Sequence, residues 1–108
     1  MQITTLKSGS VTIVVFDGRL DSVTAADAEP TVLDLLKDGD VVVDLEAVRY
    51  MSSAGLRLFL KAAKAARAGN INFSVCGSQS AVRDVFEISG FNKVISSFAT
   101  RAEALGER

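Results

Sequence analysis

The chain has 108 residues, of which 48% are hydrophobic and 23% are charged, and its formal net charge is −1. This length and composition predict a single soluble globular domain over residues 1–108, and they exclude a disordered or collagen-like chain. A charge so close to zero provides no basic field for nucleic acid or an anionic membrane, so we expect neither as a partner.

Histidine is absent, and Cys76 is the only cysteine. The lack of histidine removes the commonest general base, the Ser-His-Asp triads and most zinc sites, so we expect a non-enzyme without a metal or cofactor. A lone cysteine cannot form a disulfide within the chain, and the N-terminus lacks the pattern of a signal peptide. We therefore expect a cytoplasmic protein.

The N-terminal segment predicts a β-hairpin. Residues 3–6 and 11–16 are rich in β-branched and apolar side chains, and residues 8–10, Ser-Gly-Ser, lie between them. This pattern is typical of two antiparallel strands joined by a tight turn. We expect residues 17–21 to form a loop after the second strand.

Helical patterning follows over residues 22–37, with Pro30 inside it and Gly39 after it. Proline removes a backbone donor and clashes with the preceding turn, so we expect either a kink or a helix that begins near Pro30. Gly39 is expected to end the helix. The apolar run 41–45 is typical of a strand buried on both faces.

The rest of the chain alternates helical and strand patterns. The predicted elements are a helix at 56–68 ended by Gly69, a strand at 71–76, a helix at 80–89 ended by Gly90, a strand at 94–95 and a helix at 101–105. Strands that alternate with helices predict an α/β fold with a mostly parallel sheet and right-handed crossovers. The N-terminal antiparallel hairpin makes this a mixed sheet.

The segment 43–57, VDLEAVRYMSSAGLR, leads from a buried strand through a short loop into a helix. Ser52 is placed as the N-cap, and Ser53 then lies in the first helical turn. The first-turn amides lack intrahelical partners and the helix dipole is positive there, so a phosphate on Ser53 would be tolerated by the fold. Such a phosphate would change what the surface binds. Two serines before a helix are also an ordinary cap, so spacing alone leaves both interpretations open.

Three segments together resemble the STAS-domain anti-sigma factor antagonists. They are YMSSAGL at 50–56, FDGRLD at 16–21, and SVCG at 74–77 followed by SAVR at 80–83 and ISGF at 88–91. The resemblance implies a mixed-sheet α/β fold with about four helices and a partner-switching cycle. In that cycle the unphosphorylated antagonist binds a GHKL-type serine kinase that is also the anti-sigma factor. Phosphorylation separates them, and a PP2C-type phosphatase restores the antagonist.

The resemblance also implies roles for individual residues. The phosphoacceptor of the family lies two residues before the motif glycine, Gly55, which places it at Ser53. The preceding residue is commonly Asp in the family but is Ser52 here, which makes Ser52 the alternative acceptor. Asp21 matches a loop aspartate near the acceptor and is expected either to face the kinase or to cap the helix that follows it.

The expected partner-binding residues cluster around this motif. They are Asp21, Met51, Ser52, Ser53, Gly55 and Arg57. Met51 would supply an apolar contact if it is exposed, whereas Leu56 is expected in the core. Arg57, Lys61, Lys64 and Arg67 share one helix face, which either meets an acidic partner or is simply solvated.

Two further features have plain structural interpretations. Cys76 sits in an apolar strand without a basic neighbour in sequence, and we expect a buried, inert thiol rather than a redox sensor. Residues 77–80, Gly-Ser-Gln-Ser, either bind an anion or provide a helix cap through Ser78 or Ser80.

Two other functions compete with the antagonist hypothesis. One is a STAS subunit of a non-sigma system, such as a secretion regulator, a stressosome-like scaffold or a lipid-transport ATPase. The other is an enzyme with Ser53 as its nucleophile, although neither a histidine nor an obvious lysine or acid is available as the base.

Overall fold

A computed structural model describes residues 1–106, which form one five-stranded sheet with helices packed around it. The strands lie in the order β1 (Gln2–Ser8), β2 (Val11–Leu20), β3 (Val41–Met51), β4 (Phe73–Cys76) and β5 (Ser96–Phe98). The β1–β2 pair is antiparallel and the other three pairs are parallel. The predicted α/β fold with a mixed sheet and an N-terminal hairpin is confirmed.

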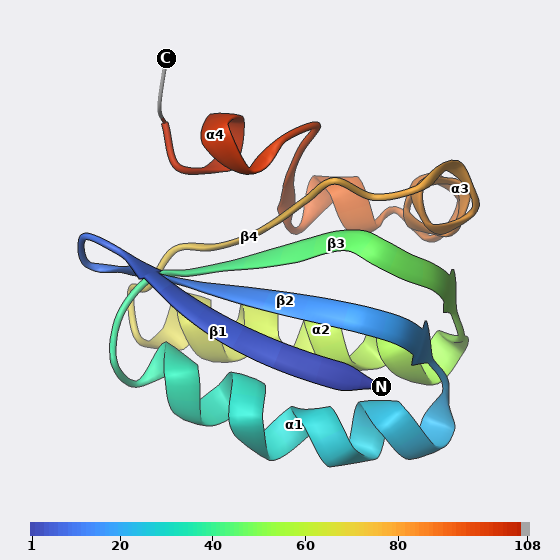
Figure 1. The fold of residues 1–108 in the computed structure, drawn as a ribbon, viewed down its shortest axis with the longest axis horizontal. Coiled ribbons are helices and arrows are strands. Elements are labelled where there is room, and N and C mark those ends of the chain that lie inside the picture. Colours follow the sequence, from blue (N-terminus) through green and yellow to red (C-terminus); the bar gives the residue numbers. More distant parts are fainter. Residues whose placement is uncertain (107–108) are drawn as a thin grey trace.

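Four helices and a short 3-10 turn connect the strands. They are α1 (Ser22–Leu36), α2 (Ser53–Ala68), α3 (Ser80–Ser89), η1 (Phe91–Lys93) and α4 (Arg101–Ala104). Figure 1 shows α1 and α2 side by side beneath the strands and α4 above them. None of the helices described within residues 1–106 has the length and apolar character needed to cross a bilayer.

The core lies mainly between the sheet and the helices. Alternate residues at the start of β3 (Val41, Val43 and Leu45) point into it, and five phenylalanines from separate elements meet there. Phe86 of α3 stacks on Phe91 of η1 with 4.0 Å between ring centroids, and Phe16 of β2 stacks on Phe59 of α2 at 5.9 Å. Aromatic pairs of this kind add about 0.5–1.5 kcal/mol beyond the area they bury, so the first pair holds α3 against η1 and the second holds α2 on the sheet.

Both predicted loops at the ends of β2 and β3 are wrong, because the strands continue. The β2 strand reaches Leu20 and β3 reaches Met51, and irregularities in their register occur at Val15/Asp17 and Gly18/Arg19. Such bulges let a strand bend without losing its pairing partner. Leu20 and Met51 are thereby carried into the core at the strand ends.

The helix α1 runs through Pro30 without restarting, so the predicted start near Pro30 is wrong. A capping box at Asp21 and Thr24 fixes the beginning of the helix, and four buried residues along it hold the remainder on the core. Pro30 lies on the exposed side, where water can solvate the backbone groups that a proline leaves unpaired. The helix ends at Leu36, before Gly39.

The last strand lies two residues beyond its predicted place at 94–95. Ile95 is only 2% exposed and belongs to the core, whereas the ladder with β4 begins at Ser96. Ile95 therefore fills the core after η1 rather than pairing with β4, whereas Val94 is exposed.

Candidate functional site

Two helices begin side by side at one edge of the sheet. Because β2 and β3 are parallel, their carboxyl ends meet there, and Leu20 pairs with Met51. The helix α1 starts directly after Leu20, and α2 starts directly after Met51 and Ser52. The backbone N–H of Ser52 donates a hydrogen bond to the Leu20 carbonyl at 2.8 Å, which ties the two helix starts together.

Ser52 is the N-cap of α2, as predicted. Its Oγ accepts the N–H of Gly55 at 3.3 Å, and its carbonyl accepts the N–H of Leu56 at 3.0 Å. Ser53 is exposed in the first turn. Within the described chain, the N–H groups of Ser53 and Ala54 have no hydrogen-bond acceptor. Free first-turn amides and the positive end of the helix dipole make this a favourable place for an anion.

Asp21 caps α1, which is one of the two roles expected for it. Its Oδ1 accepts the N–H of Val23 at 3.1 Å and that of Thr24 at 3.0 Å, while Thr24 Oγ1 accepts the N–H of Asp21 at 2.9 Å. The hydrogen bond from the Thr24 backbone is the main reason why the pKa of the Asp21 carboxyl is lowered. A contact between Asp21 and a kinase stays a prediction.

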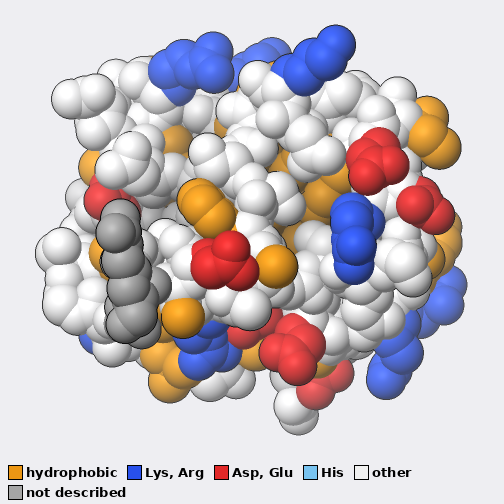
Figure 2. Space-filling view, turned by 90° about the horizontal axis from the view of Figure 1, so that it is seen from above, with side chains coloured by type: hydrophobic (Ala, Val, Ile, Leu, Met, Phe, Trp, Pro, Cys, Tyr) orange, Lys and Arg blue, Asp and Glu red, His pale blue; other side chains and the backbone are white. Residues whose placement is uncertain are grey.

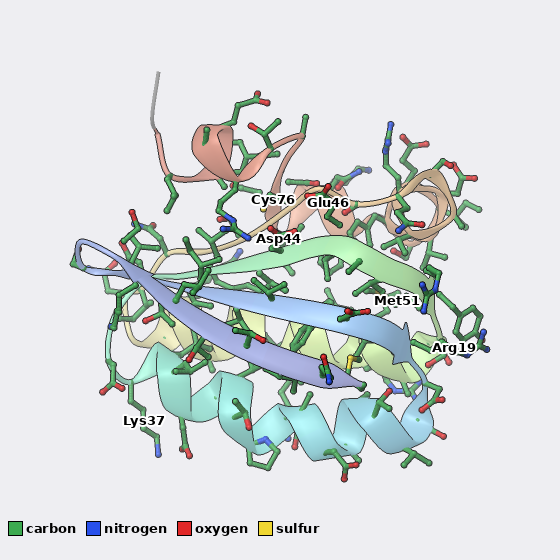
Figure 3. All side chains as sticks on the ribbon, in the orientation of Figure 1. Arg19, Lys37, Asp44, Glu46, Met51 and Cys76 are labelled. Carbon is green, nitrogen blue, oxygen red and sulfur yellow. The ribbon has the colours of Figure 1, made fainter. Side chains whose placement is uncertain are left out.

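Exposed apolar and aromatic side chains border the two helix starts. Val23 is 68% exposed and Tyr50 is 41% exposed, and the guanidinium carbon of Arg19 lies 4.4 Å from the centroid of the Tyr50 ring. Figure 3 shows Arg19 at the same end of the sheet as Met51 and away from Asp44. Val23, Tyr50 and Arg19 were not among the contact residues predicted from the sequence.

The exposure of Val23 could have been predicted from the periodicity of the helix. The buried residues of α1 include Ala25 and Ala28, and at about 100° per residue Val23 falls on the opposite side of the helix. An apolar side chain that faces away from the core is a candidate contact residue. The stacking of Arg19 on Tyr50 had no such signal, because it depends on the shifted β2–β3 register.

Met51 and Gly55, two of the predicted partner-binding residues, are buried, so the structure does not place them on the surface. Met51 is only 4% exposed and packs in the core. Gly55 is buried, and a Cβ atom at this position would lie 3.0 Å from both Leu20 Cβ and Met51 Cγ. These two residues let α2 approach the strand ends closely. Leu56 packs against the core, as expected.

Arg57 and the other cations of its stripe are exposed on α2. Lys61 Nζ lies 3.1 Å from Oε2 of Glu29 on α1, and this pair bridges the two helices. Arg57 also borders a shallow pocket between α1 and α2, of about 340 Å³. The candidate site thus includes Asp21, Ser52, Ser53 and Arg57 from the predicted set, with Val23 and Tyr50 added.

Cys76 is buried at the end of β4, as expected of an inert thiol. Burial raises its pKa to about 11, and the nearby Asp44 carboxylate contributes to the shift. Figure 3 places Cys76 next to Asp44, beneath α4. Arg101 of α4 donates to Oδ2 of Asp44 through Nε at 3.1 Å and through a terminal nitrogen at 2.8 Å, an ion pair that the sequence did not predict.

The predicted cap of α3 by Ser78 or Ser80 is wrong. Gln79 occupies the N-cap position and makes no side-chain cap, because its Nε2 donates instead to the Glu46 carbonyl at 2.7 Å. The alternative prediction of an anion at residues 77–80 stays untested.

Comparison with known proteins identifies the family. A family model for the STAS domain matches residues 2–104. The chain is 34% identical over 106 residues to BtrV of Bordetella bronchiseptica, a candidate anti-sigma factor antagonist, and the match covers 96% of this chain and 91% of that protein. It is 28% identical to the anti-sigma-F factor antagonist RsfB of Mycobacterium tuberculosis over 95% of this chain and 85% of RsfB.

Solved structures share the fold. A candidate anti-sigma factor antagonist from Thermotoga maritima superposes with a TM-score of 0.91 at 18% identity, over 96% of this chain and 92% of that one. The Bacillus protein SpoIIAA in its phosphorylated form superposes with a TM-score of 0.74 at 17% identity, over 97% of both chains.

Proposed function

The chain belongs to the STAS domain family, among its anti-sigma factor antagonists, and on that premise we propose that phosphorylation of Ser53 switches its binding to an anti-sigma factor. In this proposal the partner is a GHKL-type protein that is both anti-sigma factor and serine kinase. The unphosphorylated chain binds this partner, the kinase transfers a phosphoryl group from ATP to Ser53, and a PP2C-type phosphatase removes it. The chain itself acts as a cytoplasmic binding module and not as an enzyme.

One observation carries the proposal: an exposed hydroxyl at a helix start lies on a surface with exposed apolar side chains. Ser53 is exposed in the first turn of α2, and Val23 and Tyr50 flank the same edge of the sheet. A phosphate adds about −1.5 to −2 charges at neutral pH. Covering such a group in an apolar contact removes its hydration at a large cost in free energy, so the modified surface binds its partner poorly.

The fold itself tolerates the phosphate. The unpaired amides of Ser53 and Ala54 and the positive end of the α2 dipole favour an anion. The modification therefore changes partner binding without unfolding the domain. A phosphorylated form of SpoIIAA with the same fold is consistent with this mechanism.

Local geometry favours Ser53 over Ser52 as the acceptor. Ser52 Oγ is occupied by the N–H of Gly55 and the residue is half-buried, whereas Ser53 is exposed. A kinase that used Ser52 would have to break the N-cap of α2 before reaching the hydroxyl. Such a cap contributes about 1 kcal/mol to stability.

The test combines phosphorylation with binding. The chain is incubated with ATP and candidate GHKL-type kinases from the same genome, and the tryptic peptide that covers residues 50–57 is analysed by mass spectrometry. We expect one phosphate on Ser53 and loss of the complex with the kinase. Ser53→Ala should abolish the phosphate and keep the binding, and Ser53→Asp should weaken the binding.

Ser52→Ala is the matched control for this experiment. It should still accept phosphate at Ser53, although the melting temperature falls with loss of the cap. If Ser52→Ala removes the phosphate and Ser53→Ala does not, the acceptor is assigned wrongly. If no GHKL-type protein binds the chain, the partner assignment itself fails.

A further inference from the structure

The helix α2 carries only positive charges. Its sixteen residues, SAGLRLFLKAAKAARA, include two lysines and two arginines and no Asp or Glu. We call these four residues the α2 stripe: Arg57, Lys61, Lys64 and Arg67, all of them exposed. Figure 2 shows Lys and Arg side chains, without Asp or Glu between them, along the margin that lies at the back of Figure 1, where α2 runs.

The α2 stripe continues directly from Ser53. At about 100° per residue, Ser53 and the four cations fall within roughly 120° of the helix circumference. The opposite side of α2 carries the buried residues Leu58, Phe59 and Ala62. Arg57 lies four residues after Ser53, and the distance along the axis from Arg57 to Arg67 is about 15 Å. The acceptor hydroxyl and the stripe thus belong to one surface.

Stability does not explain this concentration of charge. Among residues 1–106 only Lys61 of the stripe forms an ion pair, with Glu29 at 3.1 Å. Arg67 lies in the last turn, where the helix dipole favours a cation. Arg57 lies in the N-terminal half, where the dipole does not favour it, and no acidic residue occupies the first turn.

We propose that the α2 stripe is an electrostatic docking surface for an acidic patch on the anti-sigma factor, an inference that rests on the proposed function. Carboxylates of the partner would meet Arg57 close to Ser53 and meet Lys64 and Arg67 further along α2. Complementary charges of this kind accelerate association and fix the orientation of the partner.

The charges around the stripe select a protein rather than a polyanion. The helix α1 packs beside α2 and carries Asp27, Glu29 and Asp34 without a Lys or Arg. An extended phosphate backbone or an anionic membrane would be repelled by this acidic neighbour, and the net charge of −1 gives no compensating attraction. A compact acidic patch about 15 Å long can contact the stripe alone.

This surface adds a second effect to the switch. A phosphate on Ser53 lies one helical turn from Arg57, at a spacing at which opposite charges attract. The phosphate therefore competes with the partner's carboxylates for the cation nearest to the acceptor. Lys64 and Arg67 lie two to three turns beyond Arg57, so they do not pair with the phosphate and can still attract the partner's carboxylates.

The test is a charge reversal far from Ser53. Lys64→Glu is compared with Lys7→Glu on β1, which is the same substitution at another exposed lysine and gives the same net charge. The binding of each unphosphorylated variant to the GHKL-type partner is measured at two salt concentrations. We expect Lys64→Glu to weaken binding about fivefold at low salt, mainly through the association rate, and Lys64→Gln to weaken it about twofold.

The control variant Lys7→Glu should stay within about twofold of the natural chain, and the defect of Lys64→Glu should shrink as salt screens the charges. If the natural chain binds the partner and both reversals bind equally well, the docking surface is refuted while the proposed function stands. If the natural chain binds no such partner, the proposed function fails first. Binding of duplex DNA that Lys64→Glu abolishes, or dimerisation that it abolishes, would assign the stripe to another occupant and overturn the proposal.

Discussion

The backbone N–H of Ser52 donates to the carbonyl of Leu20 at 2.8 Å, and this hydrogen bond joins the starts of two helices that are distant in sequence. This hydrogen bond follows from the parallel pairing of β2 and β3, in which Leu20 lies opposite Met51, the residue before Ser52. The caps of α1 and α2 are therefore held in fixed relative positions by the sheet. A surface built on such a support can change its charge without changing its shape.

Close packing at this junction predicts that Gly55→Ala destabilises the domain. The added Cβ would lie 3.0 Å from Leu20 Cβ and 3.1 Å from the Leu20 carbonyl oxygen, and the backbone cannot move aside cheaply. Although alanine favours helix, we expect a loss of about 1–3 kcal/mol in the free energy of unfolding, measured in urea. Gly69→Ala is the control, because its nearest contact is 3.5 Å. Equal effects of the two substitutions would contradict the packing argument.

The cap of α1 predicts a pH dependence of stability. The hydrogen bond from the Thr24 backbone lowers the pKa of Asp21 below its ordinary value of 3.8, so the folded state favours the carboxylate. The resulting stability is present above pH 3.8 and is lost as the pH falls through the lower pKa of the folded state. We expect the melting-temperature advantage over Asp21→Asn to decrease below about pH 4. The asparagine still accepts cap hydrogen bonds, so an advantage that is constant down to about pH 2.5 would contradict this account.

The ion pair of Arg101 and Asp44 predicts that the short helix α4 contributes to stability. The Asp44 side chain is only 6% exposed and that of Arg101 is 40% exposed, so Arg101→Ala would leave a buried carboxylate without its partner. We expect a loss of about 2 kcal/mol, below the range for fully buried pairs because Arg101 is partly solvated. Arg83→Ala is the control: Arg83 is exposed and donates to the Ser78 carbonyl at 3.3 Å. Comparable losses in urea unfolding would argue against a special role for the ion pair.

The order of helices and strands was predictable because it depends on local patterns. The stripe of apolar residues in α2, its serine cap and the glycines after α2 and α3 follow directly from helix geometry and capping. The strand ends were not predictable in the same way. The exposed Arg49 and Tyr50 look like loop residues, yet pairing with β2 keeps them in β3 up to Met51.

In the candidate site, too, features set by local sequence were predictable and features set by tertiary contacts were not. Ser52 and Asp21 could be assigned as caps because each precedes a helix with the required side chain. The burial of Met51 and Gly55 depends on how α2 approaches Leu20, which is a tertiary contact without a signature in sequence. The Arg101–Asp44 pair joins residues 57 positions apart, and only the fold of the chain brings them together.

Burial of Cys76 predicts an unreactive thiol. Desolvation raises its pKa to about 11, so at about pH 8 only about one thiol in a thousand is the reactive thiolate, against roughly one in four for an ordinary cysteine. We expect the native protein to react with a thiol reagent at least about 100-fold more slowly than the urea-unfolded protein. Equal rates in the two states would show that the thiol is accessible.

Exposed apolar side chains allow the proposed binding surface to be tested without disturbing the fold. Val23 and Ile88 are 68% and 89% exposed, but Val23 lies in the first turn of α1, at the same edge of the sheet as the start of α2, whereas Ile88 lies on α3. Val23→Glu places a charge in the apolar part of the proposed binding surface, and we expect the affinity for the proposed GHKL-type partner to fall more than about tenfold. Ile88→Glu makes the same chemical change elsewhere and should leave the affinity within about twofold, and both variants should keep the melting temperature because neither side chain is in the core. A partner that tolerates Val23→Glu but rejects Ile88→Glu would place the interface on α3, and the surface at the helix starts would then not be the one that the partner binds.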